Sequence, residues 1–197
     1  TGSGLMKNVK EAYSFLMHNV EHGDNIYMVG YSRGAATIRI LVDLLKRVGL
    51  LYKHQENLLP HLLRAYLDNN EELLQNFADI SADIPIIRNI ILYDTCFGWF
   101  IESNRWSNIL TYDSWETMAD SIVHYVCTEE PRFFLRPHTW ITPLNSTTIY
   151  CKEYEYKGNH TQIASDKRLL KNTMFLLNIF NQYSDTRNVE TKPINLL

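Results

Sequence analysis

The sequence predicts an α/β fold with a mostly parallel sheet flanked by helices. Three observations lead to this prediction. Short, nearly continuous apolar runs alternate with amphipathic helical segments, and such runs are typical of buried parallel strands. A Gly-x-Ser-x-Gly pentapeptide centred on Ser32 lies between one of these runs and the helix that follows it. Acidic residues and a histidine come directly after later strand-like runs.

The expected elements follow this alternation. Apolar residues at helical spacing predict helices over residues 8–24, 35–49 and 165–184, and one or two helices over residues 59–80. Apolar or alternating runs predict strands over residues 25–30, 85–96, 121–130 and 147–158, and residues 114–126 offer an alternative helical start to the third strand. Gly23 and Gly49 lie where the first two helices are expected to end.

The composition is that of an ordinary globular chain, with a single domain over residues 1–197 and a loose polar tail over residues 180–197. The net charge of −3 and the lack of a basic run argue against nucleic acid as a partner. Three widely spaced cysteines match neither a disulfide framework nor a zinc site, a usage typical of cytoplasmic proteins. Because the chain starts without Met, like the middle of a longer polypeptide, its compartment is not indicated.

The pentapeptide has the context of a nucleophile elbow, in which a sharp strand-to-helix turn exposes a serine. Gly30 and Gly34, two residues before and after Ser32, would let the strand and the helix approach each other closely. The backbone N–H of Arg33 would face a developing oxyanion at the start of the helix. The alternative is a serine in an ordinary tight turn.

The elbow requires an acid and then a histidine later in the chain, each just beyond a strand end. Asp94 follows the run "NIILY", and Glu129 and Glu130 follow the run "IVHYVC". We favour Asp94, because it is short and lies directly at its strand end, and keep the two glutamates as alternative acids. His160 follows the fourth strand, and His138, in a proline-bounded loop, is its best rival.

At these residues the chain resembles an uncharacterised α/β-hydrolase domain family that includes the phospholipase effectors of type VI secretion. The resemblance lies in "GYSRGA", with Arg39 in the following helix, and in "ILYDTC", "HYVCTEEPRFFLRP" and "KGNHTQ". It covers most of residues 1–180 and implies a Ser–His–Asp esterase, with Ser32, Asp94 and His160 at the matching positions. No metal or other cofactor is required by this chemistry.

The chain departs from the family pattern in two places. The family continues after its histidine with Asp and a glycine run, whereas Gln162 stands in the place of that Asp here, which predicts a remodelled loop. The strand and Asp-Gly-Thr segment that open the family are absent. We therefore expect the C-terminal portion of an α/β-hydrolase fold without its N-terminal strands, whose sheet a companion segment or chain would complete.

Two function classes remain open at this point. The first is a serine ester hydrolase that acts on a lipid or phospholipid ester, with peripheral membrane contact; an acyltransferase or thioesterase would share its acyl-enzyme. The lipid substrate is implied by the resemblance alone. The second is an inactive subunit of the same fold with a structural or interaction role in a larger assembly, which the two departures suggest.

Overall fold

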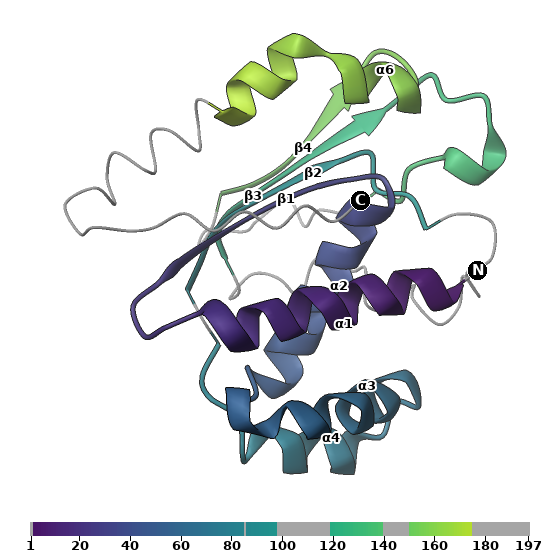
Figure 1. Ribbon diagram of the computed structural model, residues 1–197. Coiled ribbons are helices and arrows are strands. Elements are labelled where there is room, and N and C mark those ends of the chain that lie inside the picture. The colour runs from purple at the N-terminus through teal and green to yellow at the C-terminus, as the bar shows by residue number, and fades with distance from the viewer. Residues whose placement is uncertain (1, 85, 98–118, 140–149, 175–197) are drawn as a thin grey trace.

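The computed structural model describes residues 2–84, 86–97, 119–139 and 150–174 (Figure 1). Its strands are β1 (Asn25–Tyr31), β2 (Ile86–Tyr93), β3 (Ala119–Cys127) and β4 (Tyr150–Tyr156). Its helices are α1 (Gly2–Asn19), α2 (Arg33–Val48), α3 (Leu59–Leu67), α4 (Glu71–Ala78) and α6 (His160–Ser165), with short 3₁₀ helices η1 (Lys53–Leu58) and η4 (Phe133–Leu135). Residues 167–174 are also helical.

The four strands form one sheet in the order β1-β2-β3-β4, and every pair is parallel. Tyr31 of β1 pairs with Tyr93 of β2, which pairs with Tyr125 of β3. The carboxyl ends of the strands therefore lie along the same edge of the sheet. The residues that follow these strands, including Ser32 and Asp94, meet at that edge, as ligand sites commonly do in open α/β sheets.

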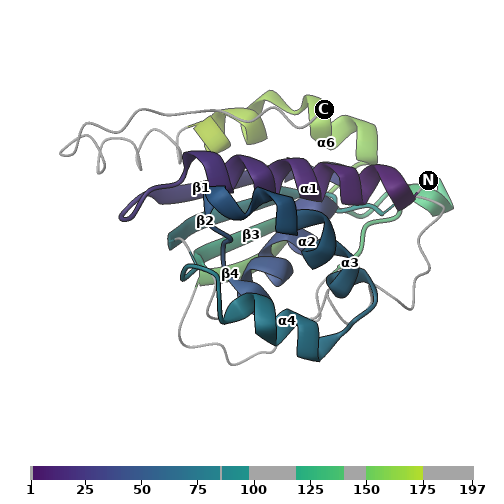
Figure 2. The ribbon, with the colours of Figure 1, turned by 60° about the horizontal axis from the view of Figure 1, so that its bottom comes forward.

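Helices cover both faces of the sheet. In Figure 1, α1 and α2 lie below it, and α6 with the helical residues 167–174 lies above it. Figure 2 shows α3 and α4 at the end of the molecule away from α6. In the larger core, helices α1, α2, α3 and α4 pack on one face of the sheet, which contributes Ile90, Leu92 and Ile122. In a smaller cluster, Ile91 and Tyr93 on the other face pack against α6 and the helical residues after it.

The α/β class and the parallel sheet predicted from the sequence are confirmed. Gly49 caps α2 with φ +80°, and its N–H donates to the carbonyl of Leu45. The predicted end of the first helix at Gly23 is wrong, because α1 ends at Asn19 and Gly23 lies in the turn before β1. The alternative helical start to the third strand is wrong over residues 119–126, which are strand.

Residues 114–118 and 175–197 lie outside the described residues, so the start of that alternative helix and the expected loose tail stay predictions. No helix in the described ranges is long and apolar enough to cross a membrane. All three cysteines are free thiols; Cys96 and Cys127 are buried, and Cys151 is partly buried.

Candidate active site

Ser32 occupies a strained turn between β1 and α2. Its backbone angles are φ 55° and ψ −121°, a conformation that non-glycine residues rarely adopt. The serine stands at the N-cap of α2, yet its side chain makes no capping hydrogen bond. Its hydroxyl is therefore available to another partner, and an observed strain of this kind is typical of a functional position.

The two glycines of the pentapeptide differ in what surrounds them. A Cβ at Gly30 would lie 2.7 Å from Cδ1 of Ile38 and 2.8 Å from both Cα and N of Ala35, so only glycine lets α2 pack this closely on β1. A Cβ at Gly34 would meet nothing within 4 Å among the described residues. The expectation that both glycines permit the close approach is thus wrong for Gly34.

This difference gives a test of the turn. We expect Gly30→Ala to lower the free energy of unfolding by about 3 kcal/mol, since the clash with the Ala35 backbone can be relieved only by moving α2. Gly34→Ala is the matched control and should leave stability unchanged or raise it by up to about 1 kcal/mol, because alanine favours a helix. Urea unfolding of both variants measures these changes, and equal destabilisation would contradict the packing.

The side chains of Ser32, His160 and Asp94 form one hydrogen-bonded chain. Nε2 of His160 lies 2.8 Å from Oγ of Ser32, and Nδ1 lies 2.5 Å from Oδ2 of Asp94. An ionised carboxylate can only accept, so Nδ1 carries the proton and Nε2 accepts from the serine hydroxyl. Asp94 is fully buried and the His160 side chain is 7% exposed. The structure thus brings together three residues that are distant in the sequence, with Ser32 and His160 separated by 128 positions.

Asp94 is held at the end of β2 by contacts on both its backbone and its side chain. It adopts φ +47°, and its N–H donates to the Tyr125 carbonyl at 2.7 Å. Its second carboxylate oxygen, Oδ1, accepts from the N–H of Cys127 at 2.7 Å. One oxygen is thus fixed by strand β3, and the other is directed at the imidazole.

Glu130 fixes the backbone of His160 and makes no contact with its ring. Oε2 accepts from the His160 N–H at 2.9 Å, and the carboxylate also pairs with Arg132, whose Nε lies 2.6 Å from Oε1. The Glu130 side chain is 1% exposed, and these hydrogen bonds, led by Arg132, lower its pKa to about 2. The Glu129 side chain is exposed. Of the three acidic candidates, Asp94 is the one whose carboxylate lies within hydrogen-bond distance of the His160 ring.

Tyr31 also contacts His160, through both its hydroxyl and its ring. Its hydroxyl donates to the His160 carbonyl at 2.8 Å, and its ring stacks on the imidazole with centroids 4.8 Å apart. Gln162 and Asn159 close a capping box at the start of α6, in which the Gln162 side chain accepts from the Asn159 N–H at 2.9 Å. The segment that begins at His160 is therefore a short capped helix, His160–Ser165.

Glu130 provides a prediction about stability and pH. Its pKa lies below the ordinary 4.5, so its contribution is present above that pH and is lost as the pH falls through about 2. We expect Glu130→Gln to lower the melting temperature at neutral pH, and the difference from wild type to narrow as the pH falls below 4.5. Thermal unfolding by circular dichroism at several pH values measures this. Glu129→Gln is the control and should match wild type throughout; a difference that is constant with pH would contradict the assignment.

Two further groups next to the turn that carries Asp94 are His138 and the Cys127 thiol. His138 is exposed, its ring meets Phe97 edge-on at 4.9 Å, and its N–H donates to the Thr95 carbonyl. The Cys127 thiol lies close to Asp94, but burial, and then the aspartate charge, raise its pKa so that it stays protonated. No group of three or more potential metal ligands occurs among the residues described.

Two contacts were not predicted from the sequence: those of Tyr31 with His160, and the hydrogen bond from the Cys127 N–H to Asp94. Tyr31 precedes the serine in the pentapeptide, and a large aromatic at that position was the one available signal. The N–H of Cys127 has no sequence signal, because any residue at the end of β3 except proline would supply it. Arg33 begins α2 as expected, which places its N–H among the first groups of the helix, where no intrahelical acceptor exists.

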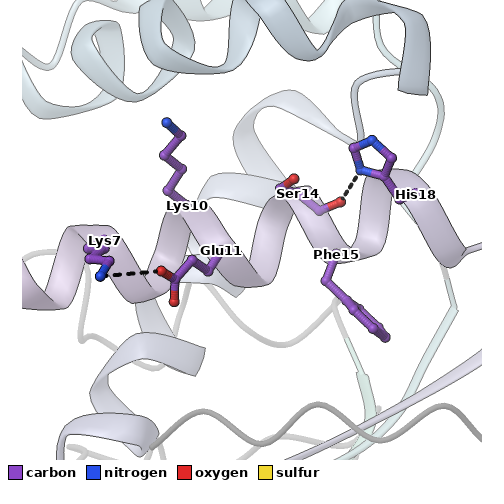
Figure 3. Close-up of a pocket in the computed structure, with 6 residues that line it drawn as sticks. All are labelled: Lys7, Lys10, Glu11, Ser14, Phe15 and His18. Carbon is purple, nitrogen blue, oxygen red and sulfur yellow. Dashed lines mark hydrogen bonds and ion pairs between the residues drawn. The ribbon is translucent and has the colours of Figure 1, made fainter.

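A separate hollow of about 490 Å³ lies against α1. Figure 3 shows the six side chains that line it, all from α1: Lys7, Lys10, Glu11, Ser14, Phe15 and His18. Lys7 and Glu11 form an exposed ion pair, and His18 bonds to the Ser14 carbonyl within the helix. None of its lining residues belongs to the hydrogen-bonded chain.

A parallel sheet with a strained serine after one strand, hydrogen-bonded to a histidine and an aspartate at the same edge, is the arrangement of the α/β-hydrolase class. Comparison with known families agrees: residues 1–184 match the family model described as "T6SS, Phospholipase effector Tle1-like, catalytic domain". The chain belongs to this family of type VI secretion phospholipase effector catalytic domains.

One curated relative is the uncharacterized protein YEL023C of Saccharomyces cerevisiae, which is 44% identical over 62 residues. That alignment covers 32% of this chain and 9% of the yeast protein, so the chain spans a small part of the relative's length. No solved structure matches the chain.

Proposed function

We propose that the protein is a serine hydrolase that cleaves the carboxylic ester bonds of phospholipids. The observation that carries the proposal is the continuous hydrogen-bonded chain from Ser32 through His160 to Asp94, built on a strained turn. Membership of a phospholipase effector family supports a lipid ester as the substrate class. Because such esters lie at a bilayer surface, we propose peripheral contact with the membrane.

In the first half of the reaction, Oγ of Ser32 attacks the ester carbonyl carbon while Nε2 of His160 takes the hydroxyl proton. The carbonyl electrons move onto oxygen, and the Arg33 N–H at the start of α2 donates to that oxyanion. Asp94 keeps the Nδ1 proton in place and stabilises the imidazolium. When the tetrahedral adduct collapses, the C–O bond to the alcohol breaks and Nε2 returns the proton to the leaving alcohol.

The second half repeats these steps with water as the nucleophile. Nε2 of His160 removes a proton from water, the hydroxide adds to the acyl carbon, and Ser32 leaves with the proton from Nε2 as the carboxylic acid is released. The burial of Asp94 serves both halves, since its charge acts on the imidazolium with little screening by water.

Release of fatty acid from phospholipid vesicles tests this proposal. The protein as the cell makes it is incubated with vesicles of phosphatidylethanolamine and phosphatidylglycerol, and free fatty acid and lysophospholipid are measured by mass spectrometry. Wild type should release both products, and Ser32→Ala should release neither. Folded wild-type protein that reacts with neither vesicles nor a soluble ester would instead favour the inactive subunit.

A further inference from the structure

The turn that carries Asp94 is fixed by three successive backbone N–H groups. Those of Asp94 and Cys96 donate to backbone carbonyls, at 2.7 Å and 3.3 Å. The N–H between them, of Thr95, donates to a side chain, Nε2 of His124, at 3.3 Å, and the Thr95 hydroxyl lies 3.0 Å from the same nitrogen. His124 is completely buried in β3 and has no part in the proposed reaction.

These contacts determine where the proton of His124 lies. A backbone N–H can only donate, so Nε2 must accept and the ring proton must be on Nδ1. Nδ1 lies 3.0 Å from Oε2 of Glu153, the residue that pairs with His124 across β3 and β4. The carboxylate accepts from Nδ1, and Nε2 accepts from Thr95. Glu153, His124 and Thr95 thus form a second hydrogen-bonded chain that ends one residue from Asp94.

The surroundings of the His124 ring, burial above all, lower its pKa. Burial lowers the pKa of His124 most strongly, and Arg39 of α2 also lowers it, while Glu153 and Asp94 act in the opposite direction. Arg39 is itself fully buried and donates from Nη1 to the His138 carbonyl at 2.8 Å. A protonated His124 would place an N–H against the Thr95 N–H, so the neutral ring is the form that fits this turn.

We propose that His124 and Glu153 are positioning residues for Asp94: Glu153 fixes the tautomer of His124, and His124 holds the Thr95 peptide so that the Asp94 carboxylate meets His160. This inference rests on the proposed function of Asp94. Hydrogen-bonded partners that orient a reacting group are worth a large factor in rate, because small displacements of that group are costly. Among the described residues, the hydrogen bonds of the pair reach Thr95 and not Ser32 or His160.

Kinetics of Glu153→Gln on a soluble ester test the proposal. An amide can donate to Nδ1 and so favours the wrong tautomer, and we expect kcat/KM to fall about 10- to 100-fold, mainly in kcat. The acid limb of the pH profile, set by His160, should move to lower pH, because a displaced Asp94 stabilises the imidazolium less. Thr95→Val should also lower kcat/KM, because it removes the hydroxyl that lies next to Nε2 of His124. Thr95→Ser should keep a kcat/KM near that of wild type, because serine retains the hydroxyl.

The matched control is Asp43→Asn. Asp43 is a buried carboxylate of α2 that accepts from the Tyr66 hydroxyl at 2.8 Å, so the change neutralises a similar group elsewhere in the core. It should lower the melting temperature without moving the acid limb. If Glu153→Gln behaves in the same way, losing stability but keeping the wild-type pH profile and kcat, the pair is only structural and the proposal is overturned.

A spectroscopic measurement separates this proposal from the proposed function. Nitrogen-15 NMR of labelled wild type should show His124 with its proton on Nδ1, and Glu153→Gln should change that signal. A proton on Nε2 of His124 overturns the positioning role, whatever the activity. Failure of wild type to react with a fluorophosphonate, with His124 in the expected form, would instead overturn the role of Ser32 and with it the dependent role assigned to the pair.

Discussion

Replacing Ser32 with alanine is expected to reduce ester hydrolysis by a factor on the order of 10⁴ or more, with the fold unchanged. The hydroxyl is the only protein group that forms a covalent bond to the substrate in the proposed reaction, and Nε2 of His160 lies 2.8 Å from its oxygen. Removing it therefore deletes the nucleophile and opens no cavity in the core. Initial rates on a soluble ester, with circular dichroism to monitor the fold, measure the effect.

Ser81→Ala is the control for this substitution. Ser81 also has a hydroxyl that hydrogen-bonds within the protein, to the Phe77 carbonyl at 2.8 Å, but it lies in the turn after α4. The rate of Ser81→Ala should stay within about twofold of wild type, since this partly buried hydroxyl contacts none of the three residues of the proposed reaction. Retention of more than a tenth of the wild-type rate in Ser32→Ala would rule out Ser32 as the nucleophile.

Asp94→Asn is expected to lower kcat by a factor on the order of 10⁴. The N–H of Cys127, 2.7 Å from Oδ1, will hold the amide oxygen in that place and turn the amide nitrogen toward His160. An amide N–H that faces Nδ1 forces the ring proton onto Nε2. Nε2 can then no longer accept the proton of the Ser32 hydroxyl. The nucleophile then loses its base, although every heavy atom keeps its position.

The pH dependence of kcat in Asp94→Asn distinguishes this mechanism from misfolding. Activity should recover partly at high pH, where hydroxide substitutes for the missing base, and the melting temperature should stay near that of wild type. Asp43→Asn, a similar change in a buried carboxylate outside the site, should leave kcat unchanged. A fall of less than tenfold in Asp94→Asn would point to a different acid.

The sheet was predictable because β1, β2 and β3 contain compact apolar runs and β4 alternates, whereas the helices show a helical apolar period. The strained serine was predictable for the same reason, since strand, pentapeptide and helix are contiguous in the sequence. The end of α1 was not predictable from the sequence, because Val20 continues the apolar spacing toward Gly23 although the helix ends at Asn19. Helical spacing in residues 119–126 was misleading because most of β3 is buried on both faces and so does not alternate.

The choice of acid was not predictable with certainty from the chain alone. Asp94 and Glu130 both follow strands that end at the same edge, and only the fold shows that one carboxylate meets the His160 ring and the other its backbone N–H. The role of His124 depends on cross-strand register, which pairs it with Glu153 and brings it to Thr95. Contacts of that kind lie between strands and leave no local pattern.

Mapping the adduct of a fluorophosphonate probe tests the central claim most directly. The intact protein is labelled, digested and sequenced by mass spectrometry, with His160→Ala and the Ser81→Ala control treated in parallel. We predict a single adduct on Ser32 in wild type and in Ser81→Ala, and its loss in His160→Ala, because only a serine whose proton is taken by Nε2 reacts. An adduct on another residue, or equal labelling of Ser32 without His160, would contradict the account.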